Sequence, residues 1–563
     1  MAESAAASTS DEHSPLLREM ETETVTVEGV VDYKGNPVNR SNVGGWRSAA
    51  FVIGVEVAER LAYYGINSNL ITYLTGPLRQ STATAAENVN AWSGAAMMLP
   101  LLGAFVADAF LGRYRTILFA SLLYILGLGL LTLSTVISVE LQIIIFFCSL
   151  YLVAFAEGGH KPCVQAFGAD QFDARDPKEC KSRSSFWYFA SNIGILVSFS
   201  ILNYIQDDIN WGLGFGIPCV SMVLSLVVFL LGTKTYRYSL KDDKCNPIMR
   251  ITHVFLVAAR NWRITPSASI VEEEAGETHL SHGARQYRFL DKALITASNS
   301  PDGLKNDLKA CSISEVEEAK AVLRLFPIWA TCLFYAVVFA QSSTFFVKQG
   351  ATMDRSMGSS FQIPSASLQS FICVSILVFV PIYDCVILPI SRVLTKKPSG
   401  ITMLQRVGVG MLLIMISMVI AALVEKERLK IARDSGLVDL PDATVPMSVW
   451  WLVPQFVLFG VSDVFTMIGL QEFFYSQMPD GLRSVGVSLY LSIFGVGSFL
   501  SSFLISIIEK VTCGSGKDCW FSNNLNQAHL DYFYWLLAGL SGLGLIVYLY
   551  FARSYVYKRE RTM

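Results

Sequence analysis

The sequence predicts an all-α polytopic membrane protein, with twelve transmembrane helices in two pseudo-symmetric halves of six. Of the 563 residues, 52% are hydrophobic and only 16% are charged, and the mean hydropathy is +0.44. Ordinary globular domains carry roughly 25% charged residues. The missing charges leave repeated apolar runs near the ~20 residues that a helix needs to cross a bilayer. The lipid bilayer is therefore the expected environment.

The charge and cysteine content exclude other classes. The 44 basic and 46 acidic residues nearly cancel, so no basic field is available for nucleic acid. Eleven cysteines and six histidines are scattered without metal-ligand spacing, which predicts no metal site and no metal cofactor.

The apolar runs divide the chain into two blocks. Residues 1–45 form a polar leader without the basic and apolar regions of a signal peptide, so we expect it in the cytosol. The first six-helix bundle covers 46–233 and the second covers 324–552, followed by a cytosolic tail, 553–563. The expected spans lie near 47–75, 89–110, 115–137, 141–168, 184–205, 211–232, 324–347, 367–390, 401–424, 448–475, 484–508 and 531–552.

The charged segment 234–323 is interpreted as a cytosolic linker between the two bundles. It contains Glu272, Glu273 and Glu274 but no catalytic set. No nucleophile with a base occurs at either membrane face, so an enzyme is not predicted.

Lys and Arg in the short loops predict the orientation. They gather in the loops after the second, fourth and eighth spans, which the positive-inside rule places in the cytosol together with both termini. The loop after the ninth span disagrees, because it carries Lys426, Arg428, Lys430 and Arg433. Cys513 and Cys519 would then face the outside or a lumen, where a disulfide can persist; the sequence leaves open whether they form one.

Six plus six spans joined by a linker are the outline of a secondary transporter with a site near mid-membrane. The informative residues are charges inside spans. Glu56, Glu59 and Arg60 share one face of the first span, because their spacings are three and four residues. Two acids against one base leave a surplus carboxylate that can load and release a proton. The alternative is a static ion pair that fixes helix packing.

Lys161 in the fourth span is the second costly charge. We expect a carboxylate of the first span to pair with it, so that protonation of that carboxylate releases it; the alternative is snorkelling to an interface. Pro162 and the preceding glycines predict a bent, closely packed helix. Neighbouring His160 is interpreted as a packing residue rather than a proton relay.

Two further sets of charges complete the candidate residues. Asp463 in the tenth span would pair with Lys161 from the second half. Asp108 and Arg113 flank the tight turn after the second span, where Gly112 permits it, and would latch the inner gate.

The charged residues of the first and fourth spans, with the sequence around them, resemble the plant nitrate/peptide transporter family, the proton-dependent oligopeptide transporters of the major facilitator superfamily. Glu56-x-x-Glu59-Arg60 followed by Tyr63-Tyr64-Gly65 is similar to the family's ExxER motif. GAFVADAFLGRYRTILFASLLYILG, GGHKPCVQAFGADQFD and FAQSSTFFVKQG match further family segments. The resemblance covers nearly everything after the leader.

This resemblance implies roles for single residues. Glu56, Glu59 and Arg60 would form the proton relay with Lys161 as partner. The substrate site would be lined by Arg60, Tyr63, Tyr64, Lys161, Asn192, Phe339 and Asp463. The alternative for the two tyrosines is simple packing.

Three departures from the family pattern bear on these roles. Asp463 stands where the family usually has Glu. The start of the fifth span is about three residues shorter than usual. Phe339 occupies a position where nitrate-carrying members can have histidine, so nitrate would have to meet Arg60 or Lys161.

The resemblance therefore implies a proton-coupled symporter of a small anionic or zwitterionic solute, nitrate or peptide-like, with protons and that solute as its partners and no cofactor. The alternatives are a substrate-sensing membrane protein with little transport, and a carrier of a larger organic anion such as a plant hormone or secondary metabolite. In the leader, Glu12, Leu16 and Leu17 fit an acidic dileucine sorting motif, which favours the vacuolar membrane over the plasma membrane. The sequence leaves the oligomeric state undetermined.

Overall fold

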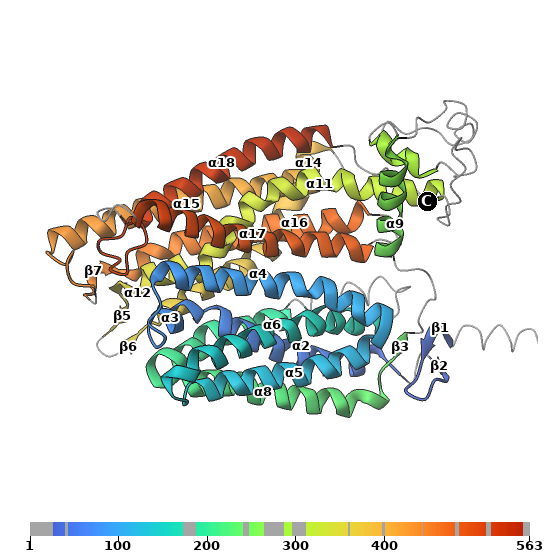
Figure 1. The fold of residues 1–563 in the computed structure, drawn as a ribbon, viewed down its shortest axis with the longest axis horizontal. Coiled ribbons are helices and arrows are strands. Elements are labelled where there is room, and N and C mark those ends of the chain that lie inside the picture. Colours follow the sequence, from blue (N-terminus) through green and yellow to red (C-terminus); the bar gives the residue numbers. More distant parts are fainter. Residues whose placement is uncertain are drawn as a thin grey trace, which may run out of the picture.

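Most of the chain outside the leader, the linker and several loops is described by the computed structural model. The described residues are 26–39, 43–172, 187, 189–239, 247–263, 287–294, 311–358, 361–396, 400–441, 443–478, 483–513 and 519–555. Long helices lie along one another in two groups, the first half in blue and green and the second in yellow to red (Figure 1).

The first half contains five long helices and a sixth described in pieces. Its elements are α2 (Gly45–Asn67), α3 (Leu70–Thr75), α4 (Thr82–Val106), α5 (Arg113–Ser134), α6 (Val139–Asp170), the span Phe189–Ile209 and α8 (Trp211–Leu231). The span Phe189–Ile209 includes two π-helical turns, Ser198–Leu202 and Ile205–Ile209, and a third extends α4 over Ala107–Leu111.

The second half repeats this plan with helices broken near their ends. Its elements are α11 (Ile313–Phe339), α12 (Phe345–Ala351), α13 (Ser370–Ile382), α14 (Leu388–Thr395), α15 (Met403–Asp434), α16 (Val453–Ser476), α17 (Arg483–Cys513) and α18 (Leu530–Ser554). A π-helical turn, Tyr383–Ile387, joins α13 to α14 in one continuous span, Ser365–Thr395.

In the described part of the chain, eleven helices are long and apolar enough to cross a membrane. The charges of Glu56, Glu59 and Arg60 keep α2 from reaching that level of apolarity, although it lies within the first group of helices (Figure 1). Adding α2 completes the predicted set of twelve.

Two helices extend beyond the apolar segments that predicted them. Ser312 and Glu315 form a reciprocal capping box that begins α11 at Ile313, so the helix starts inside the segment interpreted as linker. Thr402 and Gln405 begin α15 in the same way, and this helix continues to Asp434.

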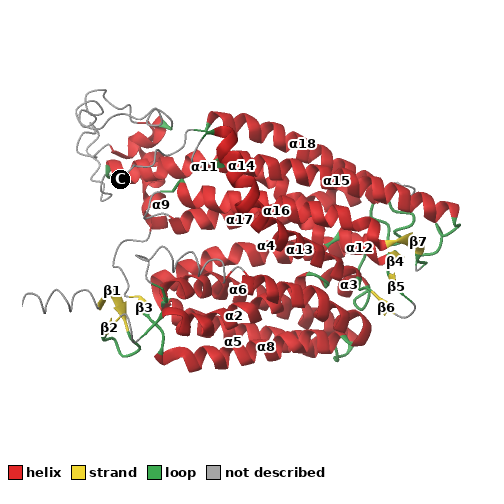
Figure 2. Cartoon of the chain, turned by 180° about the vertical axis from the view of Figure 1, so that it is seen from behind, coloured by secondary structure: helices red, strands yellow, loops and turns green. Residues whose placement is uncertain are grey.

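Small β-structures lie at both ends of the bundle (Figure 2). At one end, β1 (Thr26–Val31) pairs with β2 (Pro37–Asn39) and with β3 (Tyr238–Ser239), both antiparallel. The linker helix α9 (Pro247–Arg260) lies at this end across the direction of the spans (Figure 1). At the other end, β4 (Met353–Asp354) pairs with β7 (Val445–Ser448), and β5 (Ser356–Met357) with β6 (Phe361–Gln362).

The two halves meet along α4 and α17, which come together at Gly94 and Gly495. A Cβ built on Gly94 would lie 3.0 Å from the Gly495 carbonyl oxygen, so the two backbones are nearly in contact. Small residues allow this close approach in membranes, where lipid offers no hydrophobic force between helices.

Candidate proton-coupling and substrate site

The charges of α2 form the ion pairs that their spacing predicts. The Arg60 Nη2 and Nε atoms donate to Glu56 Oε1 at 2.8 and 3.0 Å, and Arg60 Nε lies 3.5 Å from Glu59 Oε2. Exposed fractions are 1% for Glu56, 0% for Glu59 and 7% for Arg60. One buried cation therefore contacts two buried carboxylates.

Lys161 interacts with Glu59 of the first span, where we expected its partner, but its ion pair lies within its own helix. Its Nζ atom lies 3.3 Å from Glu157 Oε1, one helical turn earlier on α6. Glu157 is fully buried, and the Lys161 side chain is 11% exposed. Because i and i+4 residues face each other on a helix, this pair needs no movement of α2 to form.

The α2 and α6 groups nevertheless make one cluster. Gln165 Nε2 donates to Glu56 Oε1 at 3.4 Å, and the carboxyl groups of Glu59 and Glu157 are close enough to interact. The cluster thus brings three carboxylates and two cations together in the interior of the first half.

Close backbone packing holds α6 in place beside this cluster. A Cβ built on Gly103 of α4 would collide with the carbonyl group of Gly158, the residue after Glu157. Both glycines are therefore required for this contact, in agreement with the predicted close packing of the fourth span.

Aromatic side chains cover the charges. Tyr63 is 1% exposed, stacks on Trp92 with 5.4 Å between ring centroids, and meets Tyr64 edge to face at 5.2 Å. The Lys161 Nζ atom lies 5.4 Å from the centroid of the Tyr63 ring, within the range of a cation–π contact. Tyr63 therefore packs tightly and also faces Lys161, the cation expected to bind the substrate.

Histidine and tyrosine groups of α5 and α6 adjoin the same carboxylates. Tyr124 OH donates to Glu157 Oε2 at 3.4 Å. His160 is fully buried and meets the Tyr124 ring edge to face at 6.1 Å. Neither of its ring nitrogens has a hydrogen-bond partner among the described residues, as suits a packing residue.

The fifth span approaches the cluster from a third side. A Cβ on Gly194 would lie 2.7 Å from the Val57 carbonyl oxygen and 3.2 Å from Arg60 Cβ. Asn192, two residues earlier, is 5% exposed. The predicted site residue is therefore buried on a span that packs directly on α2.

The second half contributes a carboxylate with a partner of its own. Asp463 on α16 is 4% exposed, and its Oδ1 atom accepts a short hydrogen bond from Tyr335 OH of α11. The expected pairing of Asp463 with Lys161 is therefore replaced by a bond within the second half. Phe339 lies with its ring centroid 5.1 Å from Phe494 and 5.7 Å from Phe459, so its surroundings are aromatic.

Comparisons with known proteins agree with this architecture. The model of the POT family matches residues 114–521. The chain is also 62% identical over 549 residues to Protein NRT1/ PTR FAMILY 5.10 of Arabidopsis thaliana, covering 94% of this chain and 97% of that protein.

The chain belongs to the POT family. Another POT relative, Protein NRT1/ PTR FAMILY 5.12 of Arabidopsis thaliana, is 55% identical over 559 residues, with 95% of this chain and 97% of that protein covered. A crystal structure of an auto-inhibited POT family peptide transporter superposes with a TM-score of 0.72 at 23% identity, covering 92% of this chain and 99% of that one. The fold of this chain is therefore the twelve-helix fold of POT transporters.

Of the two residues predicted to latch the gate of this POT protein, the structure describes the side chain of Arg113. Arg113 Nη1 contacts Asp170 Oδ2 at 2.6 Å and Oδ1 at 2.8 Å, so it joins the start of α5 to the end of α6 within the first half. The side chain of Asp108 lies outside the described residues. Glu12, Leu16 and Leu17 of the sorting motif also lie outside them.

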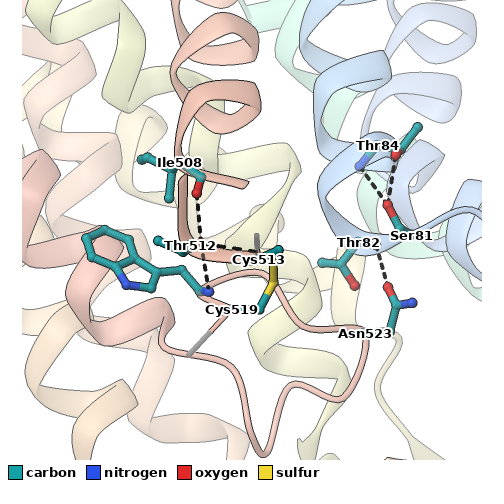
Figure 3. The surroundings of a disulfide bond; sticks show 9 residues. Ser81, Thr82, Thr84, Ile508, Thr512, Cys513, Cys519 and Asn523 are labelled. Carbon is teal, nitrogen blue, oxygen red and sulfur yellow. Dashed lines mark hydrogen bonds between the residues drawn. A yellow bond between two sulfur atoms is a disulfide. The ribbon is translucent and has the colours of Figure 1, made fainter. Parts of the chain in front are cut away.

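Cys513 and Cys519 form a disulfide after α17, with 4.4 Å between their Cα atoms (Figure 3). Asn523, a few residues later, accepts a hydrogen bond through Oδ1 from the Thr82 backbone N–H at 3.0 Å. The disulfide thus lies near a contact between the two halves.

Proposed function

We propose that this POT-family protein is a proton-coupled symporter that moves a small anionic or zwitterionic solute, nitrate or peptide-like, by alternating access. The observation that supports the proposal is the buried cluster of Glu56, Glu59, Arg60, Glu157 and Lys161. With every group charged, it holds one more negative than positive charge. A buried unpaired charge is costly, so uptake of a proton there is coupled to the stability of the conformation.

The two cations would meet the negative end of the solute. Arg60 already contacts two carboxylates and Lys161 one, so an anion that enters must compete with them. Protonation of a carboxylate removes a competitor and frees a cation. The proton cancels the surplus negative charge of the cluster and frees a cation for the solute, so the carrier loaded with both is the form that changes conformation most easily.

The test is uptake into oocytes at about pH 5.5 and about pH 7.5, a range over which a buried carboxyl can exchange its proton. Leu16 and Leu17 are changed to Ala to favour the cell surface, and labelled nitrate and a dipeptide mixture are offered separately. We expect acid-stimulated uptake of one of them, lost as uphill transport in Glu59→Gln. Proton-driven accumulation that persists in Glu59→Gln would overturn the assignment. No uptake of either solute, with surface expression verified, would favour a larger organic anion or a sensing role.

We further propose that both termini are cytosolic and that the protein resides in the vacuolar membrane. The basic residues after the ninth span argue against this orientation less strongly than their number suggests. Arg428, one of them, is neutralised inside the protein by Glu425 at 2.6 Å. Lys430 contacts Glu427 at 3.1 Å. Protease protection of tags at each terminus in isolated vacuoles would test both statements.

A further inference from the structure

We propose that Glu157 is a specificity-determining residue of the transport site, an internal counter-ion that occupies Lys161 until it is protonated or displaced. The inference rests on the proposed symport function. It concerns a residue that spacing alone identifies as the partner of Lys161 and that our sequence analysis did not select.

The pair is built into one helix. Glu157 and Lys161 lie one turn apart on α6, at 3.3 Å, and both are largely shielded from solvent. Because both belong to the same rigid element, rocking of one half against the other does not separate them. Only a change of charge or a competing anion does.

The surroundings of Glu157 come from three helices. From α2 it faces Glu59, Arg60 and the Tyr63 ring, from α5 it meets Tyr124, and its own helix adds Lys161. Oε2 accepts from Tyr124 OH at 3.4 Å, whereas Oε1 has the ion pair and no hydrogen bond among the described residues. Two adjacent carboxyls are best satisfied when one carries a proton and donates it to the other.

This arrangement makes substrate binding depend on a proton in a specific way. While Glu157 is ionised, Lys161 is neutralised and offers little to an anion. Once Glu157 is protonated, Lys161 loses the ion-pair partner that lies 3.3 Å away, and an anion can bind to it in competition with Glu59 alone. The apparent affinity is then the intrinsic affinity multiplied by the fraction of protein in which Glu157 is protonated.

The experiment compares Glu157→Gln with the wild type, using nitrate and dialanine as separate probes. The KM of the wild type should rise roughly tenfold or more between about pH 5.5 and about pH 7.5, whereas Glu157→Gln, whose Lys161 lacks its ion-pair partner at every pH, should change less than about threefold and have the lower KM at the higher pH. Glu157→Asp, which keeps the charge one turn from Lys161, should retain the wild-type dependence. Glu472→Gln is the matched control, because this carboxylate on α16 is 53% exposed.

A binding measurement covers the case of a variant that folds and binds the solute but cannot change conformation and so shows no uptake. The shift in thermal unfolding caused by nitrate, and separately by dialanine, is recorded on purified protein at both pH values, with the double variant Glu157→Gln/Lys161→Met as the form lacking the cation. The probe that is taken up should stabilise the wild type only at the lower pH, Glu157→Gln at both, and the double variant at neither.

The outcomes separate the two proposals. A wild type without acid-stimulated uptake or proton-dependent binding of either probe overturns the proposed function. A wild type that transports, with Glu157→Gln lowering the rate while KM keeps its dependence on pH, overturns the role of Glu157, because a residue that only positions Lys161 would give that result.

Discussion

At the scale of single residues, buried ion pairs within one helix are the contacts that sequence spacing can reveal. Glu56 and Arg60 were predicted from their separation of four residues, and the structure confirms them at 2.8 Å. Glu157 and Lys161 have the same separation, yet the expectation of a partner on another helix obscured it. By contrast, Tyr335 and Asp463 lie 128 residues apart, so only the fold brings them together.

Arg428 and Glu425 form another buried ion pair within one helix, and we predict that breaking it lowers the stability of the protein strongly. Both side chains are fully buried, and Arg428 also donates to Asn526 Oδ1 at 2.9 Å. Arg428→Ala leaves the Glu425 charge buried without its partner, which should cost about 3–5 kcal/mol. Thermal unfolding of the detergent-purified protein, monitored by size-exclusion chromatography, measures this loss.

Lys430→Ala is the matched control for that variant, because its ion pair with Glu427 is exposed on the same helix. It should change stability by no more than about 0.5 kcal/mol. Equal losses in the two variants would show that the buried pair has no special weight.

At the scale of elements, hydropathy located the spans well and their ends poorly. The ninth span was predicted to end near residue 424, but α15 continues to Asp434. The charges of Glu425 and Arg428 neutralise each other inside the protein, so the helix can continue past the end of the apolar run. The short strands that pair residues 26–39 with Tyr238–Ser239 were not predicted, because such pairing joins segments far apart in the chain.

The approach of α4 to α6 gives a prediction about glycine. Gly103→Ala should place a methyl group against the backbone of Gly158 and cost about 1–3 kcal/mol through overpacking. Because Glu157 is the neighbour of Gly158, uptake should fall as well. Gly129→Ala on α5, where a Cβ meets nothing within 4 Å, should leave uptake unchanged; a similar loss there would contradict the packing argument.

The small core formed by α9 and the start of α11 gives a prediction about pH. Burial raises the pKa of the Cys311 thiol, with a contribution from Glu315, and its Sγ atom lies 3.4 Å from His253 Nδ1. The neutral thiol is thus the favoured form in the folded protein, so the stability linked to it is present at neutral pH and is lost as the pH rises past the value for an unfolded thiol, about 8.5.

Alkylation of a variant that retains Cys311 as its one free thiol measures this directly. The rate of reaction with iodoacetamide should reach half of its maximum near about pH 8.5 in detergent-unfolded protein and at a higher pH in the folded protein. Identical pH profiles in the two states would contradict the shift.

At the scale of the whole molecule, the twelve-helix plan and its two halves followed from hydropathy, but the contacts between the halves did not. Near the end with α3 and α12, five hydrogen bonds between described residues cross from one half to the other; they join Ser68 to Gln369, Thr75 to Lys348, Thr82 to Asn523, Glu87 to Ser502 and Asn90 to Ser501. The structure is therefore closed at this end.

If transport requires this end to open, a covalent link across it should stop the cycle. We predict that cysteines at positions 82 and 523, joined by a flexible bifunctional thiol reagent, reduce uptake to background, and that a reducing agent restores it. Cysteines at 439 and 527, which replace the hydrogen-bonded Asp439 and Gln527 within the second half, should be cross-linked without loss. Normal uptake with 82 and 523 fully linked would exclude opening at this end.

The contact of Gly94 with Gly495 has a mechanical consequence. It lies near the middle of α4, about 18 Å from either end of that helix at 1.5 Å per residue. Because the two backbones are nearly in contact there, one half can rotate about this point relative to the other, and a tilt of about 10° would move each end by about 3 Å over that length. Displacements of opposite sign at the two ends would thus arise from a single rotation, without any helix having to slide along its neighbour.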